Sequence, residues 1–202
     1  MSRARLVPIL VVAAIVVVAG VLVALTLHQP SVATFSPTVA VPRDSGPALV
    51  GPRVYTVDAT DSETWRYFSF AMGSVIDDAQ RWDLAFRRYQ ILANGGPQYP
   101  GKGGVRDLGA VIFDDVRAVP DAGYAVTENT PDPKNPAIAG WYSYGFFSHV
   151  LKPKPHVWAV RTADRRYAKM EIVSYYCPQG RPGCVTFRYV FQGDGTTTLR
   201  GS

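Results

Sequence analysis

The chain has 202 residues, of which 12% are aromatic, and its formal net charge at pH 7 is +5. This length allows one domain of about 150 residues with extensions, and the aromatic content can supply a substantial core. Arg3 and Arg5 precede the first apolar segment and all 16 acidic residues follow it, so the remainder carries a net charge of only +3. A nucleic-acid-binding domain needs a concentrated basic face, and this composition argues against such a partner.

Residues 6–27 form a run of 22 residues without a charge. At ~1.5 Å per residue, a helix of that length crosses a hydrocarbon layer of ~30 Å. The sequence after Leu27 lacks the small-x-small pattern of a signal-peptide cleavage site. We therefore predict that residues 1–28 are a cytoplasmic stub and a single-pass transmembrane signal-anchor of the cell membrane. Because Arg3 and Arg5 lie before the segment, the remainder is expected on the extracytoplasmic side.

Residues 29–53 contain five Pro among Ser, Thr, Ala, Val and Gly, without a clear hydrophobic period. This composition is typical of an extended linker, so we predict a Pro-rich tether followed by a domain over residues 54–202. The 16 Pro and 18 Gly of the chain favour many turns and short segments, and hence an all-β domain. Its first strand is expected at residues 54–58, and imperfect alternation continues over residues 66–76.

The segment of residues 81–96 carries the strongest pattern in the domain. Trp82, Leu84 and Phe86 alternate with polar or small residues, which is the two-residue period of a half-buried strand. After residue 88 the bulky apolar residues change phase, which we interpret as a bulge within one long strand. A helical stripe beginning at Trp82 is the alternative. In the strand interpretation, Trp82 and Phe86 share one inward face.

Eight short blocks of sequence follow one another along the domain in a characteristic order. They are residues 56–59, 63–70, 82–86, 101–104, 140–141, 160–164, 168–170 and 185–190. As an ordered set, these blocks resemble the HmuY family of extracytoplasmic haem-binding proteins over about residues 54–192. The resemblance implies a single antiparallel β domain that captures haem without catalysis and holds its iron through axial side chains.

Residues 140–156 contain the candidate ligand site. Candidate contacts for a flat macrocycle are Trp141, Tyr142, Tyr144, Phe146 and Phe147, and candidate haem-iron ligands are His149 and His156. Imidazole ligates haem iron, and Met72 or Met170 would be softer alternatives. In family members that use two histidines, these lie before and after the Gly-Trp block. The segment before Gly140 contains no His, so the first family ligand has no counterpart. The alternative interpretation is that His149 and His156 are ordinary strand-end residues.

Sequence motifs for catalysis do not occur. The chain has no Gly-x-Ser-x-Gly elbow, no His-Glu-x-x-His run and no dinucleotide fingerprint, so we expect no enzyme activity. Residues 101–104 (Gly-Lys-Gly-Gly) lack the spacing of a phosphate-binding loop and are assigned to a turn. A short strand is expected over residues 108–113. The predicted function is membrane-anchored tetrapyrrole binding; the alternative is an envelope structural or protein-interaction domain that keeps the scaffold without haem.

Cys177 and Cys184 are the only cysteines of the chain. They flank a six-residue turn between residues 167–176 and 185–192, which we predict to form a C-terminal hairpin. The extracytoplasmic side permits disulfides, and a bridge across a short turn between paired strands is geometrically feasible. A metal site is the alternative, but it would need further ligands nearby. We therefore predict a disulfide.

Overall fold

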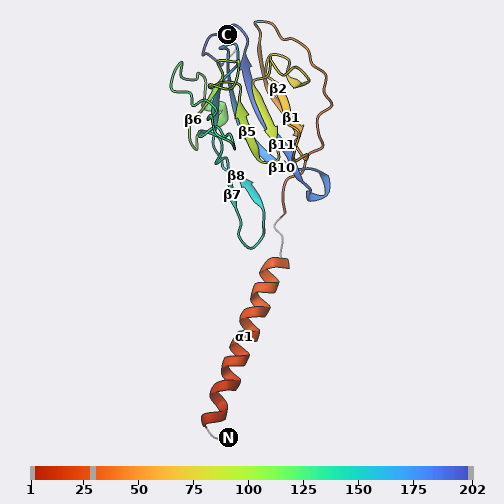
Figure 1. Cartoon of the computed structure of the whole chain (residues 1–202), viewed down its shortest axis with the longest axis vertical. Helices are drawn as coiled ribbons and strands as arrows, with labels where there is room; N and C mark the ends of the chain where they lie inside the picture. Colours follow the sequence, from red (N-terminus) through yellow and green to blue (C-terminus); the bar gives the residue numbers. More distant parts are fainter. Residues whose placement is uncertain (1–2, 28–30, 200–202) are drawn as a thin grey trace. The chain divides into compact units, whose positions relative to one another are not determined.

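The computed structural model describes residues 3–27 and 31–199, with the side chains of the N-terminal helix described for residues 9–24. The chain divides into two compact units, one of Met1–Ser31 with Tyr144–Lys152 and one of Val32–Ser143 with Pro153–Ser202. The second unit is built from antiparallel β-sheets (Figure 1). The predicted all-β architecture of the domain is therefore confirmed.

The N-terminal helix, α1, covers Arg3–Leu27. Its described side chains are exposed and carry no charge. Within residues 3–27 and 31–199, no helix is both long and apolar enough to cross a membrane. The predicted transmembrane segment, residues 6–27, extends at both ends beyond the side chains that the structure describes.

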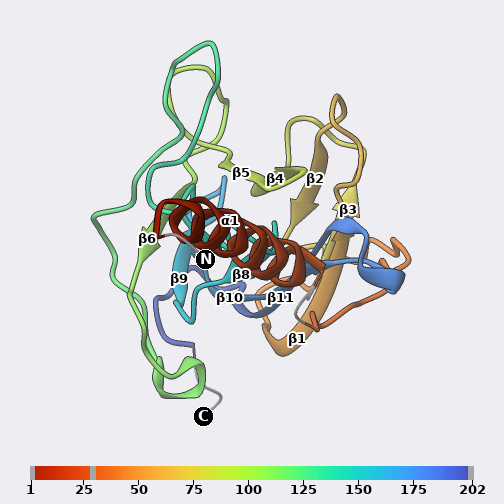
Figure 2. The same cartoon turned by 90° about the horizontal axis from the view of Figure 1, so that it is seen from below.

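Nine strands of the domain form two sheets that lie as separate layers (Figure 2). The larger sheet has the order β1 (Leu49–Asp58), β11 (Pro182–Gln192), β10 (Tyr167–Tyr176), β9 (Trp158–Arg161) and β6 (Gly104–Asp107). The smaller sheet has the order β3 (Ser74–Ile76), β2 (Arg66–Ser69), β4 (Leu84–Arg87) and β5 (Gln90–Ala93). The predicted C-terminal hairpin is confirmed, because β10 and β11 pair antiparallel.

Aromatic side chains fill the space between the two sheets. Alternate residues of β11, among them Phe187 and Tyr189, face the smaller sheet, as the two-residue period of a strand requires. The Phe187 ring lies 5.1 Å from that of Phe68 and 5.6 Å from that of Phe86, measured between centroids. Tyr189 lies 5.4 Å from Phe70. These rings are at most 1% exposed, so they form the main core.

A second apolar cluster covers the other face of the larger sheet, where Phe113 and Leu199 pack near Val190. Phe113 begins a short 3₁₀ turn, η1 (Phe113–Asp115). The buried Lys169 ammonium donates to the carbonyl oxygens of Phe113 and Val116, at 2.6 and 2.8 Å. The strand predicted over residues 108–113 is therefore wrong. This segment packs by its side chains and does not join a sheet.

The stretch of residues 82–93 is a hairpin and not one bulged strand. β4 and β5 pair in the register Arg87↔Gln90, which leaves Arg88 and Tyr89 as a two-residue turn. Phe86 enters the main core, whereas Trp82 packs on the outer face of the smaller sheet with Ala85 and Leu92. The predicted shared face of Trp82 and Phe86 is therefore wrong, because Trp82 precedes β4 across a bend at Asp83.

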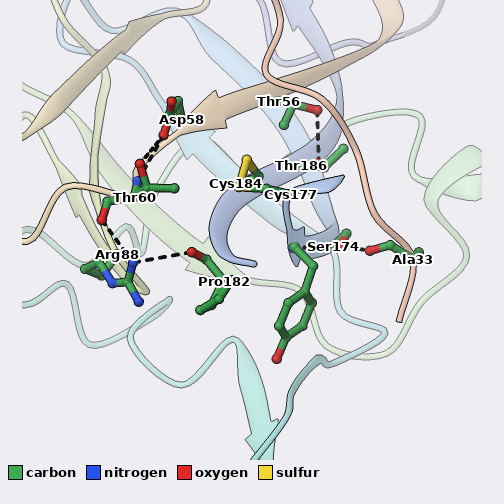
Figure 3. Close-up of a disulfide and its surroundings, with 11 residues drawn as sticks. Ala33, Thr56, Asp58, Thr60, Arg88, Ser174, Cys177, Pro182, Cys184 and Thr186 are labelled. Atoms are coloured by element: carbon green, nitrogen blue, oxygen red, sulfur yellow. Dashed lines mark hydrogen bonds between the residues drawn. A yellow bond between two sulfur atoms is a disulfide. The ribbon is translucent and has the colours of Figure 1, made fainter. Parts of the chain in front are cut away.

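The predicted tether of residues 29–53 lies against the domain over its described part. The Phe35 amide donates to the Tyr176 carbonyl at 2.9 Å, and the Thr38 amide donates to the Thr56 carbonyl at the same distance. The Ser174 hydroxyl also bonds to the Ala33 carbonyl (Figure 3). The end of this segment belongs to β1, which begins at Leu49 rather than Val54. Backbone pairing thus makes these residues part of the folded unit.

The predicted disulfide between Cys177 and Cys184 is confirmed, with a Cα–Cα distance of 4.9 Å. It closes the turn between β10 and β11, which contains η2 (Pro178–Gly180) (Figure 3). Arg88 of the β4–β5 turn donates to the Pro182 carbonyl at 3.3 Å and to the Thr60 carbonyl at 2.9 Å. The cross-linked turn is therefore joined to the smaller sheet.

Candidate functional site

The residues predicted to form the ligand site divide between the two compact units. Tyr144, Phe146, Phe147 and His149 belong to the unit that contains α1, and Trp141, Tyr142 and His156 belong to the β-sheet unit.

Residues 145–150 form the turn of a hairpin whose strands are β7 (Tyr142–Tyr144) and β8 (Leu151–Pro153). The Gly145 amide donates to the Val150 carbonyl at 2.9 Å, and the His149 amide donates to the Gly145 carbonyl at 2.8 Å. His149 has a φ of 54°, in the left-handed region that few non-glycine residues adopt. These bonds hold the imidazole at the end of the turn.

The turn presents aromatic rings to solvent. Phe146 is 75% exposed and Phe147 is 48% exposed, and their rings meet edge to face at a centroid distance of 5.3 Å. Tyr144 is 53% exposed. Single exposed apolar residues are common, but adjacent exposed rings of this size mark surfaces that bind a ligand or a partner.

Tyr144 and His149 contact each other across this turn. The Tyr144 hydroxyl and His149 Nδ1 form a hydrogen bond, which leaves Nε2 as the second ring nitrogen. A hydrogen bond at one imidazole nitrogen fixes the tautomer and the ring orientation for ligation through the other. In the tautomer in which Nδ1 is the donor of this bond, Nε2 is unprotonated and can ligate a metal; in the other tautomer the Tyr144 hydroxyl donates and Nε2 carries the proton.

His156 has a similar partner, contributed by a distant part of the chain. Its Nδ1 lies 2.9 Å from a carboxylate oxygen of Asp107 at the end of β6. The imidazole also lies beside Trp158, at a centroid distance of 5.8 Å. A carboxylate on one imidazole nitrogen is the usual outer-shell arrangement of a metal-ligating histidine, and it is also an ordinary ion pair when the ring is protonated.

Trp141 and Tyr142 lie inside the β-sheet unit. The Trp141 indole is 0% exposed and donates to the Tyr89 carbonyl at 2.8 Å. It packs on Tyr175 at a centroid distance of 5.7 Å, so it presents no surface to a ligand. Tyr142 is half-buried against Tyr89, and burial raises the pKa of its hydroxyl.

Of the two methionines considered as softer ligands, Met170 is 0% exposed within β10. Met72 lines a surface hollow together with Arg81 and Asp83. Burial of Met170 leaves its sulfur without access to a ligand from solvent. Met72 therefore stays a chemical possibility, whereas Met170 is part of the core.

A metal-ion centre built from several side chains needs three or more ligating groups close together. In the part of the chain that the structure describes, no three His, Cys, Asp or Glu residues lie close enough to hold an ion together. His149 and His156 are instead single imidazoles, each with one ring nitrogen in a hydrogen bond and the other left as a possible metal ligand. They fit a ligand such as haem, which brings four of the iron ligands itself and takes axial ligands from the protein.

Comparison with known proteins identifies the family. The HmuY protein family model matches residues 61–189, which is more than half of the chain. The chain belongs to the HmuY family. No curated protein matches it.

Solved structures of several bacterial proteins share the fold. An apo HmuY analogue from Tannerella forsythia has 18% sequence identity and a TM-score of 0.57, and the match covers 74% of this chain and 99% of that one. A candidate lipoprotein of Bacteroides fragilis has 21% sequence identity and a TM-score of 0.58, and the match covers 76% of this chain and 96% of that one. A candidate HmuY-like haem-binding protein of Bacteroides vulgatus has 19% sequence identity and a TM-score of 0.60, and the match covers 76% of this chain and 97% of that one. At these identities, the likeness establishes the fold alone.

The sequence did not reveal the partners of the two histidines. Asp107 lies 49 residues before His156 and stands in a segment without distinctive spacing. Tyr144 lies five residues before His149, and that spacing has no meaning until the turn geometry is known. The only sequence signal was the local density of aromatic residues.

Proposed function

We propose that this HmuY-family protein is a non-catalytic binding protein that holds haem, or a related flat tetrapyrrole, on the extracytoplasmic side of a membrane. The observation that carries the proposal is the hairpin turn of residues 144–149. It combines exposed aromatic rings with an imidazole whose Nδ1 is engaged by a tyrosine hydroxyl. The family and the named haem-binding relative from Bacteroides vulgatus support the choice of ligand.

His149 is the proposed iron ligand of the turn, through Nε2. Tyr144 orients this imidazole, and Phe146 and Phe147 offer apolar ring surface to the macrocycle. His156, held by Asp107, is the second candidate ligand. Haem, when bound, supplies an iron that accepts axial nitrogen ligands and an absorption spectrum that reports on them. The chain itself supplies the imidazole, its orientation and a partly apolar surface.

Placement outside the cytoplasm is supported by the Cys177–Cys184 disulfide, since such bonds persist in oxidising compartments. We extend the proposal to attachment through the uncharged segment of residues 6–27. Mass spectrometry of protein extracted from membranes should then find residues 1–27 retained. A mature chain that begins near residue 29 would contradict the attachment and would leave the ligand proposal intact.

The test of ligand binding is a titration of the full chain, purified in detergent, with ferric haemin. We expect a saturable shift of the Soret band. His149→Ala should alter the spectrum and weaken binding, and Tyr144→Phe should weaken it by roughly tenfold, the size of effect typical of an outer-shell partner. Ile112→Ser, which changes another exposed apolar residue of the domain, is the matched control and should bind as the wild type does.

An envelope structural or protein-interaction role is the competing function. It is favoured by one observation, namely that the domain residues before Gly140, 54–139, contain no histidine to pair with those after it. Absence of any spectral change with haemin would support this second function. Binding that survives His149→Ala and His156→Ala together would keep the ligand and overturn both proposed axial residues.

A further inference from the structure

A hollow of about 410 Å³ lies where three segments of the β-sheet unit meet. These are the glycine-rich loop after β5, the loop that contains Asp121 and the turn between β9 and β10. The volume is at the lower end of the range for small-molecule sites. None of the aromatic residues or histidines proposed for tetrapyrrole binding lines it, so it requires a separate explanation.

The hollow is strongly basic for its size. Lys102, Arg161 and Arg165 line it, and Asp121 is its single acidic residue, which leaves an excess of two positive charges. Across residues 31–199, the ion pairs within 4.0 Å include none of these three cations. By contrast Arg166, which follows Arg165 in the chain, is paired with Asp164 at 2.6 Å. Unpaired cations in a concave surface raise the local concentration of anions.

Hydrogen bonds between the segments fix the backbone around the hollow and the side chain of one of its cations, Arg161. Arg161 Nε donates to the Lys102 carbonyl at 2.8 Å, and its guanidinium lies over the Tyr124 ring, 5.3 Å from the centroid. The Lys102 amide donates to the Ala163 carbonyl at 2.8 Å, which joins the loop to the β9–β10 turn. Because the backbone around the cations is already fixed, a ligand would bind without the cost of ordering it.

Close packing of the glycine-rich loop explains the Gly-Lys-Gly sequence around Lys102. A Cβ atom on Gly101 would lie 2.4 Å from the Asn94 carbonyl oxygen, and one on Gly103 would lie 2.7 Å from the same atom. The Asn94 side chain also accepts a hydrogen bond from the Gly101 amide at 2.9 Å. The glycines therefore permit a tight loop that carries Lys102 to the hollow.

Two tyrosines add ring surface to the basic hollow. Tyr99 and Tyr167 line it and are each only partly buried. Tyr99 packs edge to face on Trp82 at a centroid distance of 5.6 Å, and burial raises the pKa of its hydroxyl. A tyrosine phenol keeps its proton at neutral pH and can donate a hydrogen bond to an anion.

We propose that this hollow binds a small ligand that carries an oxyanion, a carboxylate or phosphate group, on a flat ring. The guanidinium groups suit the oxygens of such an anion, because arginine donates paired N–H bonds to carboxylates and phosphates. The tyrosines suit the ring. The site is independent of haem binding, since it shares no residue with the proposed axial ligands.

The experiment uses the full chain in detergent and phenyl phosphate as the probe, with binding measured by isothermal titration calorimetry. A dissociation constant of about 1 mM or tighter is expected, and it should weaken with salt as a charge contact does. Arg165→Gln should weaken binding by roughly tenfold, the effect of one lost charge-assisted bond. Arg181→Gln is the matched control, because Arg181 is also an exposed turn arginine outside any ion pair within 4.0 Å.

Further probes separate the parts of the proposal. Benzoate should compete with phenyl phosphate if the hollow takes oxyanions as a class, and inorganic phosphate should bind more weakly because it lacks the ring. Absence of saturable binding, or equal weakening by Arg165→Gln and Arg181→Gln, would overturn the site. Equal affinity for inorganic and phenyl phosphate would overturn the role of the tyrosines.

Discussion

Two groups of aromatic residues in this chain have the same chemistry and opposite surroundings. Phe68, Phe86 and Phe187 are each 0% exposed between the two sheets, whereas Phe146 and Phe147 are 75% and 48% exposed at a hairpin turn. The buried rings have a second sheet within van der Waals reach. The exposed pair has mainly edge-to-face contact with itself. A dense run of aromatics in sequence therefore does not distinguish a core from a ligand surface; the second layer of structure does.

Phe187→Ala should have the largest effect on stability, since this ring contacts both Phe68 and Phe86. Removal of a fully buried phenylalanine leaves a cavity and should lower the free energy of unfolding by about 3–5 kcal/mol. Urea unfolding of the full chain, followed by fluorescence, measures this loss. A loss below about 1 kcal/mol would contradict the assignment of these rings to the core.

Asp83 should make the junction between the sheets sensitive to pH. Its carboxylate is 4% exposed and accepts the Phe70 amide at 2.7 Å and the Ala163 amide at 2.9 Å. Burial raises the pKa of Asp83 from 3.8 to about 6 in the folded protein. The folded state then binds this proton more readily than the unfolded state, so stability contributed by Asp83 increases as pH falls from about 7 to about 4.

Between pH 7 and pH 4 the free energy of unfolding should gain about 2–3 kcal/mol from Asp83, since each unit of pKa difference corresponds to ~1.4 kcal/mol. Asp83→Asn removes this contribution, and the measurement is the difference in unfolding free energy between wild type and variant across that pH range. Carboxylates with lowered pKa, such as Asp78 and Asp164, make the folded state less stable as pH falls. They are present in both proteins, so their contribution cancels in the difference between wild type and variant. If the unfolding free energies of wild type and Asp83→Asn changed with pH in parallel, the raised pKa of Asp83 in the folded protein would be refuted.

Loss of the disulfide should have the next largest effect. It closes a loop with a sequence separation of 7, and loop entropy gives a stabilisation of about 2–3 kcal/mol for so short a loop. The double variant Cys177→Ala with Cys184→Ala should therefore melt at a lower temperature in calorimetry. Reduction of the wild-type protein supplies the control and should give a similar decrease. Unchanged melting after reduction would mean that the β10–β11 pairing alone fixes this turn.

Phe146→Ala should have the smallest effect on stability and thereby complete the comparison. A side chain that is 75% exposed loses little buried surface, so the free energy of unfolding should change by less than about 0.5 kcal/mol. Haemin affinity of the same variant should fall if the turn binds the macrocycle. A large loss of stability without any change in haemin titration would assign Phe146 to packing and remove it from the proposed site.

The all-β class, the C-terminal hairpin, the disulfide and the HmuY resemblance could all be predicted from the sequence. These depend on information that is local or ordered along the chain. Alternation of side chains gives strands, and two cysteines that flank the turn between paired strands are within bridging distance. The aromatic turn and its histidine were also identified from local composition, although their role stays a prediction.

The face of the smaller sheet on which Trp82 packs could not be predicted from the sequence, because one bend at Asp83 reverses the outcome of strict side-chain alternation. The tertiary structure also attached residues 32–48 to the domain through backbone hydrogen bonds that no composition reveals. The pairing of Asp107 with His156 and the grouping of Lys102, Arg161 and Arg165 are of the same kind. Each joins residues that are distant in sequence, and such contacts depend on sheet order and loop closure rather than on local pattern.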